Sequence, residues 1–347
     1  MSKNSMISGP ARTARAFGPA RAARAVAAAA LLAALTACAV GPTYRRPETP
    51  TVQPHNVDAH FTAAAPNAAW WRQFGDPVLA DLEARALADN LDLHIAIARV
   101  RSARAAFTEQ QFNYAPHAPL DASYSRSKEQ FPGFSNNRLD IKSSSVGFDA
   151  TWEIDLFGHV RHQAAAAGAT LGAEQASLAD AQVTVAAEVA RNYFELRGAQ
   201  RQIAVARDNL QNEREALQLA QVRYDAGRVT ELDTDQAQSR LKATEATLPT
   251  LEAAEKRFAY RLAVLLGVAP GALDAQLSPV PVQVMTAPLP IGDVSALLRT
   301  RPDVRVAERN LASATERVGV ATADLFPRVN FTGFVGFLAG EIGRAHV

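Results

Sequence analysis

The feature that most constrains this chain is a stretch from about Val160 to Ala226 that contains no proline and repeats its large apolar residues every seven positions. The two tracks, separated by a shift of four residues, are Leu171, Leu178 and Val185, then Val189, Leu196, Ile203, Leu210, Leu217 and Tyr224. Such a shift in a heptad pattern is a stutter, which locally unwinds a left-handed supercoil. One helix over this stretch would be about 100 Å long at 1.5 Å per residue. Because no compact domain needs such a helix, the pattern predicts an elongated coiled coil.

This long stretch ends in a turn followed by a second helix. Gly227 suits a C′ position with positive φ, and Thr230 with Asp233 three residues later approximates a capping box. The returning helix carries Leu241, Leu248, Leu251, Phe258 and Leu265 before Gly267. It has about half the length of its partner and can cover only the distal half of the long helix. The tip around Gly227 is therefore predicted to project.

Two other segments, 118–128 and 144–155, alternate with period two. In the second, Val146, Phe148, Ala150, Trp152 and Ile154 share one face, while Gly147, Asp149, Thr151 and Glu153 share the other. This predicts strands with one apolar and one polar face, joined at a hairpin tip by the turn-forming residues between them. An ordinary β-sandwich and a membrane barrel both produce such alternation, so the pattern alone leaves both open.

A helix–proline–strand unit occurs twice. The first helix is predicted over 76–111 and is stopped by Pro116; the second is predicted over 294–325 and is stopped by Pro327. The same shift of 211 positions relates Asp92 to Asp303, Ala96 to Ala307, Ser102 to Ser313, Ala103 to Ala314 and Pro116 to Pro327. We therefore expect an internally duplicated fold.

The end of the chain falls where the second copy begins, so we expect truncation after the first repeat. An alternating segment, 329–337, starts a third strand. Residues 341–347 break that pattern and resemble a translated adapter oligonucleotide. We interpret them as an artefactual tail; a genuine short tail is the alternative.

The first 37 residues have the character of an export signal. They carry Lys3, Arg12, Arg15, Arg21 and Arg24 and no acidic residue. The apolar run Ala25–Leu35 is too short to span a bilayer, and it leads to Leu35-Thr36-Ala37-Cys38, which is typical of a lipoprotein cleavage site. We predict a signal peptide over 1–37 and lipid attachment at Cys38; an alanine-rich export signal with an incidental thiol is the alternative. Because Cys38 is the only cysteine, no intrachain disulfide is possible.

Composition excludes several classes of function. A mean hydropathy of −0.09 excludes a bundle of membrane-spanning helices. The formal charge of +1 becomes −4 without the five basic signal residues, and no basic cluster indicates nucleic-acid binding. We predict no catalytic residue, metal or cofactor. His159 and His162 have a spacing that could share a metal, but no third ligand is evident, and Glu153 and Asp155 fit a solvated strand face.

Several short sequence motifs along residues 38–337 occur in an order and spacing typical of one protein family. They are Val40-Gly41-Pro42-Thr43-Tyr44, Trp70-Trp71-Arg72-Gln73-Phe74-Gly75-Asp76-Pro77, Trp152-Glu153-Ile154-Asp155-Leu156-Phe157-Gly158, Leu265-Leu266-Gly267 and Arg301-Pro302-Asp303-Val304. With these strings the chain resembles the outer membrane factor family of the TolC and OprM type, and within it the lipoprotein (NodT-type) branch of RND efflux systems.

The resemblance implies a mainly α fold with a membrane β part. Three protomers would each give four strands to one twelve-stranded transmembrane β-barrel, continued by an α-helical barrel across the periplasm. It implies a lumen lined by Asp149, Thr151 and Glu153, with Phe148 and Trp152 facing lipid. The adaptor-docking and gate tip would comprise Arg223, Gly227, Arg228, Val229, Thr230 and Asp233, where Asp233 ties the tip to a neighbouring coil.

The implied function is a passive homotrimeric exit duct in the outer membrane of a Gram-negative bacterium, with a periplasmic adaptor and an inner-membrane RND pump as partners. The presence of Ala39 after the cysteine favours outer-membrane sorting. The alternative is a periplasmic adaptor lipoprotein, which also carries a helical hairpin but should show split lipoyl-type β segments.

The predicted organisation follows the chain in order. It is the signal peptide (1–37), a lipid-anchored linker (38–75), the helix of the first repeat (76–117), a β-barrel hairpin (118–155), the long helical hairpin (156–266, tip about 226–233), a connector (267–292), the start of the second repeat (293–340) and the tail (341–347).

Overall fold

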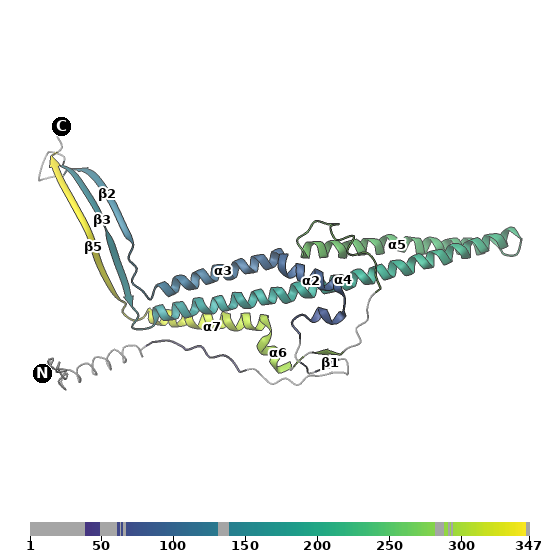
Figure 1. Ribbon diagram of the computed structural model, residues 1–347, viewed down its shortest axis with the longest axis horizontal. Coiled ribbons are helices and arrows are strands. Elements are labelled where there is room, and N and C mark those ends of the chain that lie inside the picture. Colours follow the sequence, from purple (N-terminus) through teal and green to yellow (C-terminus); the bar gives the residue numbers. More distant parts are fainter. Residues whose placement is uncertain are drawn as a thin grey trace, which may run out of the picture. The chain divides into compact units, whose positions relative to one another are not determined.

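The computed structural model describes residues 39–48, 61–62, 64, 67–130, 139–281, 288–290, 292 and 294–344. The predicted signal peptide, Cys38 and the hairpin tip at 131–138 lie outside these residues. The elements (Figure 1) are β1 (Phe61–Thr62), η1 (Trp70–Phe74), α2 (Pro77–Asp89), α3 (Leu91–Phe112), β2 (Leu120–Glu129), β3 (Leu139–Ile154), α4 (His159–Asp225), α5 (Glu231–Leu265), β4 (Leu289–Pro290), α6 (Val294–Thr300), α7 (Pro302–Ala323) and β5 (Val329–Arg344).

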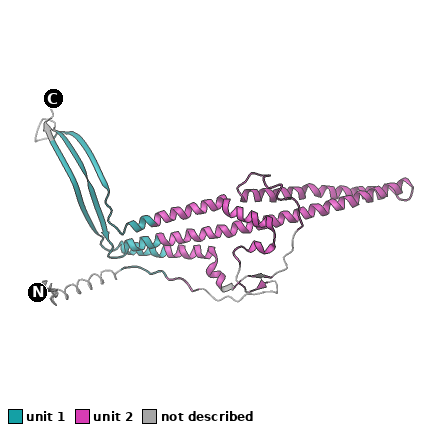
Figure 2. Ribbon diagram, viewed as in Figure 1, with its two compact units in different colours: residues 1–44, 108–166, 314–347 teal, residues 45–107, 167–313 magenta. Residues whose placement is uncertain are grey.

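The chain divides into two compact units (Figure 2). Unit 1 comprises 1–44, 108–166 and 314–347, and unit 2 comprises 45–107 and 167–313. Unit 1 contains an antiparallel sheet of order β2-β3-β5. The three predicted strands are confirmed.

β5 extends past residue 340 into the segment predicted to be a tail, so backbone pairing does not end where the apolar alternation ends. β5 stays paired with β3 to its end, with Glu341 opposite Lys142 and Arg344 opposite Leu139. Backbone pairing continues because a ladder needs only amide and carbonyl groups, which every residue of this segment supplies.

Unit 2 is organised around the hairpin of α4 and α5. α4 has 67 residues and α5 has 35, and ion pairs such as Arg207–Glu252 at 2.9 Å and Arg214–Glu245 at 3.7 Å run between them. The heptad residues Val189, Leu196, Ile203 and Leu210 are buried. The predicted coiled-coil hairpin is therefore confirmed, with α5 covering the distal half of α4.

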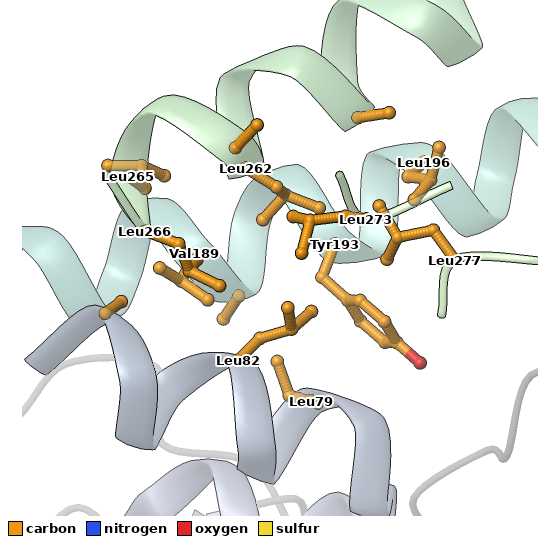
Figure 3. Close-up of a cluster of buried hydrophobic side chains, with 14 of the residues drawn as sticks. Leu79, Leu82, Val189, Tyr193, Leu196, Leu262, Leu265, Leu266, Leu273 and Leu277 are labelled. Atoms are coloured by element: carbon orange, nitrogen blue, oxygen red, sulfur yellow. The ribbon is translucent and has the colours of Figure 1, made fainter. Parts of the chain in front are cut away.

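The core of unit 2 lies where α2, α4 and the end of α5 meet (Figure 3). Leu79 and Leu82 of α2, Val189 and Tyr193 of α4 and Leu262 of α5 are fully buried. Leu273 and Leu277, from the segment predicted to be a connector, are buried in the same cluster. That segment is thus part of the core as well as a link between helices.

Both predicted single helices are divided, at equivalent positions. The first breaks at Asn90, whose Oδ1 accepts hydrogen bonds from the amides of Asp92 and Leu93 and so starts α3. The second breaks at Arg301, because Pro302 is favoured in the first turn of a new helix and disfavoured inside one. Asn90 and Arg301 are 211 positions apart, and so are both ends of α3 and α7. The prediction of unbroken helices is wrong, while the predicted duplication is confirmed.

Candidate functional sites

The sheet of unit 1 presents one face of exposed apolar side chains. The register places Phe148 between Leu120 and Val335, and Trp152 opposite Phe331. Their exposed fractions are large: 51% for Phe148, 40% for Trp152 and 77% for Val335. Such a contiguous exposed apolar surface marks an interaction site with lipid or protein.

This apolar face ends in charged cross-strand pairs that the sequence analysis missed. Arg126 of β2 forms an ion pair with Asp140 of β3, and Nζ of Lys142 on β3 lies 3.1 Å from Oε2 of Glu341 on β5. Between Ile154 and Ser144 the apolar band is about 33 Å long along the strand at 3.3 Å per residue, or about 25 Å tall at the usual barrel tilt. The sequence contained this information, because Arg126 and Lys142 are even-numbered like the apolar residues of these strands and therefore lie on the same face of the sheet.

The opposite face carries the residues predicted to line a lumen. Asp149 and Thr151 are exposed, and Thr151 stands opposite Thr332. Glu153 is half-buried, with an Oε1 3.4 Å from Nδ1 of His159. This face is not wholly polar: a Cβ on Gly147 would lie 2.6 Å from the Phe334 ring, so that ring covers the glycine.

The turn between α4 and α5 is built from two local capping motifs. Gly227 has φ of 66°; its amide donates to the Tyr224 carbonyl, and the Arg228 amide donates to the Arg223 carbonyl, both at 2.8 Å. These two bonds form a Schellman motif, which satisfies the last carbonyls of α4. The predicted role of Gly227 in the turn is confirmed.

A capping box starts α5, as predicted from Thr230 and Asp233. The Asp233 carboxylate accepts hydrogen bonds from the amide and the hydroxyl of Thr230, both at 2.8 Å. These two donors hold the pKa of Asp233 below its usual range. Arg223, Arg228, Thr230 and Asp233 are exposed and Val229 is half-buried, so the tip is available to a partner.

The two histidines and the two carboxylates singled out in the sequence serve separate contacts. Nδ1 of His162 is 2.6 Å from Oε2 of Glu316, whereas His159 contacts Glu153 and Asp324, each at 3.4 Å. Asp155 accepts hydrogen bonds from the amide and Nε of Arg161. The structure therefore does not bring either pair to one shared site.

A polar network that the sequence analysis did not find crosses the core of unit 2. Tyr193 donates its hydroxyl hydrogen bond to Asp76, the N-cap of α2; burial, with a smaller effect of Asp76, raises the pKa of Tyr193 to about 12. The buried Arg197 lies 4.9 Å from the Tyr193 ring centroid and donates to the Ser278 carbonyl at 2.7 Å. The network joins three segments, but its partners are too distant in sequence for a pattern to reveal.

The described residues combine a long antiparallel coiled-coil hairpin, a duplicated helix–strand unit and a sheet with one exposed apolar face, the features expected of an outer-membrane efflux protein. Among the described residues, no helix is both long enough and apolar enough to cross a membrane. Residues 82–268 match the family described as outer membrane efflux protein. The chain belongs to the outer membrane efflux protein family, which assigns it to the outer membrane.

Individual relatives agree with this assignment. The chain is 30% identical to nodulation protein T of Rhizobium leguminosarum bv. trifolii, covering 87% of this chain and 64% of that protein. It is 33% identical to the pyoverdine export outer membrane protein OpmQ of Pseudomonas aeruginosa, covering 76% of this chain and 56% of the relative. The solved structure of the outer-membrane channel OprN superposes with a TM-score of 0.80 at 39% identity, covering 88% of this chain and 73% of that one. The chain thus spans less than two thirds of the length of these two sequence relatives.

Proposed function

We propose that this chain is part of an outer-membrane channel subunit that acts as a passive exit duct of a tripartite RND-type efflux system. The observation that carries the proposal is the exposed apolar band of the β2-β3-β5 sheet, bounded by charged pairs. Its height of about 25 Å equals that of the lipid-facing band of membrane barrels. The adaptor alternative predicts split β segments and is not favoured by the family match.

Closure of the sheet accounts for a trimer. Within the described residues, the outer edges of β2 and β5 have no strand partner, and a sheet inside lipid must close so that every backbone group is paired. Three protomers that each contribute four strands would close a twelve-stranded barrel. Phe148 and Trp152 would then face lipid, while Asp149, Thr151 and Glu153 would line a polar lumen.

Trp152 has the contacts of a residue at a membrane interface. Its ring lies on the apolar face, while its Nε1 donates to the Tyr114 carbonyl at 3.1 Å. Tryptophan is enriched at such interfaces because one part of its ring is apolar and its N–H requires a polar partner.

The α4–α5 tip is the proposed docking site for the periplasmic adaptor. The last carbonyls of α4 are capped by backbone amides, so the exposed side chains of Arg223 and Arg228 remain available for partner contacts, and Asp233 uses only its Oδ2 in the cap of α5. Cys38 is the proposed lipid-attachment residue. Mass spectrometry of the mature N-terminus should find acylated Cys38; a different start or an unmodified thiol would contradict this part.

The membrane face can be tested through Trp152, since the chain has three tryptophans. In a Trp70→Phe/Trp71→Phe variant, the remaining Trp152 should be quenched by brominated acyl chains after insertion into vesicles. Trp152→Phe, which keeps the other two rings, is the matched control and should show little quenching. Quenching of Trp152 by aqueous acrylamide alone would overturn the proposed membrane face.

The efflux function needs a separate test in cells. A full-length form, expressed with an RND pump and its adaptor in a strain without its own exit channel, should restore resistance to pump substrates. Failure to restore resistance, with all three proteins present in the membranes, would argue against an exit duct.

A further inference from the structure

Residues 39–44, called the strap below, are held against the beginning of α4 and against α7. The Val40 amide donates to the Phe157 carbonyl at 3.0 Å, and the Val40 carbonyl lies 3.0 Å from Nε2 of His162. Both backbone polar groups of Val40 are therefore satisfied. An extended segment held in this way is fixed in its register along the helix.

Three glycines, one in the strap and two on the surface that receives it, allow the two backbones to approach closely. A Cβ on Gly41 would lie 2.8 Å from the Gly319 Cα, one on Gly319 would lie 2.5 Å from Nδ1 of His162, and one on Gly158 would lie 3.1 Å from the Ala39 Cβ. Gly41 and Gly158 also have φ of 115° and 89°, values that L side chains rarely adopt. Glycine at these positions gives the backbones the close approach that the strap requires.

The surface around Gly158, His162, Glu316 and Gly319, which receives the strap, is called the slot below. His162 is its central contact. Its ring lies between the Val40 carbonyl and the Glu316 carboxylate on α7, 2.6 Å from Nδ1. The side chains of His162 and Glu316 are only 14% and 17% exposed. Because both ring nitrogens face acceptors, the arrangement holds the ring in one orientation, with Nε2 donating to Val40.

We propose that this slot fixes the point at which the lipid anchor leaves the protein, with His162 as its positioning residue. The proposal rests on the proposed function, since it takes Cys38 as the acylated residue and the sheet as the membrane part. Cys38 directly precedes Ala39 in the sequence, and Phe157, whose carbonyl accepts from Val40, follows the last residue of β3 by three positions. An anchor attached to the residue directly before the strap would therefore start next to the end of β3.

Hydrogen exchange followed by mass spectrometry tests the slot directly on the purified chain. In His162→Ala, the peptide containing Val40 should exchange about two- to tenfold faster, the range expected for loss of one typical hydrogen bond. His162→Gln should restore part of the protection, because its amide nitrogen can still donate to the Val40 carbonyl. His94→Ala is the matched control, since it removes a histidine contact to the Ala88 carbonyl at 3.1 Å far from the strap in sequence.

Gly319→Ala gives a second test that changes no residue of the hydrogen-bonded contact itself. Alanine is a better helix former than glycine, but its Cβ would displace the His162 ring and loosen the strap. Gly198→Ala, where a Cβ meets nothing within 4 Å, should leave strap exchange unchanged. If His162→Ala also speeds exchange in the sheet, the substitution has loosened more than the strap. In that case the exchange of the strap in Gly319→Ala decides whether the slot holds it. Unchanged strap exchange in Gly319→Ala and His162→Ala would overturn the proposal.

The anchoring role is measured in vesicles on the Trp70→Phe/Trp71→Phe background. Adding His162→Ala should reduce quenching of Trp152 by brominated lipid although Cys38 remains acylated; unchanged quenching would overturn the anchoring role. If Trp152 of the parent variant is not quenched at all, the proposed membrane face fails, while the exchange experiment still decides whether the slot holds the strap.

Discussion

Large apolar side chains meet opposite environments in the two units. In unit 2, Leu79, Leu82, Val189 and Leu262 have no exposed surface. In unit 1, Phe337 is 87% exposed and its neighbours across the sheet are also open. Helices of unit 2 bury one another within the chain, whereas the sheet has an apolar face that none of the described residues of unit 1 covers.

The difference shows where each unit obtains its stability. Burial against its own helices supplies unit 2 with the hydrophobic contribution, about 25 cal/mol per Å² of apolar surface. The sheet's apolar face gains that contribution only from a bilayer or another molecule. Changes in the two units should therefore be read by different measurements.

The largest expected effect on folding comes from the core. Leu262→Ala should lower the free energy of unfolding by about 2–5 kcal/mol, because it leaves a cavity between α2, α4 and α5. Phe337→Ala should change stability in detergent little, yet weaken insertion into vesicles. Urea denaturation and vesicle flotation measure the two effects. Equal destabilisation by both variants would contradict the difference drawn between the buried core of unit 2 and the exposed apolar face of the sheet.

The second prediction concerns Glu83, a carboxyl group inside the core of unit 2. It is fully buried, and neither oxygen has a hydrogen-bond partner among the described residues. Burial raises the pKa of Glu83 from 4.5 to about 8. The folded state therefore retains a proton that the unfolded state releases, so the contribution of Glu83 to stability is greatest below about pH 4.5 and falls as pH rises to about 8.

The loss over this window should be on the order of a few kcal/mol. Urea midpoints at pH 5 and pH 8 measure it, with Glu83→Gln as the variant in which this pH dependence disappears. Glu83→Leu should also be more stable at pH 8, because it removes the buried polar atoms. If the urea midpoint of Glu83→Gln changes with pH as much as that of the wild type, the pH dependence belongs to another group.

The third prediction concerns the close contact of α4 with α5. Ala206 is 9% exposed on the buried side of α4, so Ala206→Leu should overpack the hairpin and cost about 1–3 kcal/mol. Ala216→Leu is the matched control, since Ala216 is exposed on the same helix. Thermal unfolding separates the two, and similar melting temperatures would contradict the predicted coiled-coil packing.

The parts of the fold that could be predicted from sequence are those specified locally. A heptad track reports the buried side of α4 because helix geometry repeats along the chain, and Gly227 with Thr230 and Asp233 forms its turn within a few residues. The alternation of β3 is equally local. These signals need no knowledge of the partner.

The parts that escaped depend on contacts between distant residues. Asn90 ends one helix and starts the next while its Nδ2 donates to the Leu265 carbonyl, 175 positions away. Arg197 is buried because the segment around Ser278 supplies carbonyl acceptors. The contact of His162 with Val40 crosses 122 positions. No periodicity encodes such pairs.

The smallest expected effect on stability, and the sharpest test of function, concerns Asp233. Its hydrogen bonds to Thr230 account for a cap at the start of α5. Because these donors lower its pKa, the capping contribution is present above the unfolded value and is lost only as pH falls through the lower folded value. The tip should therefore stay capped at neutral pH. Whether Asp233 also holds a gate closed against a neighbouring coil requires variants that separate the two roles.

Thr230→Ala and Asp233→Ala make that separation in a full-length form. Thr230→Ala removes the hydroxyl donor of the cap and leaves the carboxylate, whereas Asp233→Ala removes the carboxylate; Asp233→Glu keeps the usual residue of a capping box. A residue that only caps the helix predicts a small drop in trimer melting temperature for Thr230→Ala and Asp233→Ala, and no leak. A gate latch predicts that Asp233→Ala alone makes cells sensitive to vancomycin, a compound too large to cross an intact outer membrane. We expect sensitivity with Asp233→Ala and none with Thr230→Ala. If neither variant sensitises the cells while both lower the melting temperature, Asp233 acts only as a helix cap. The tip would then differ from the rest of unit 2 only in being exposed.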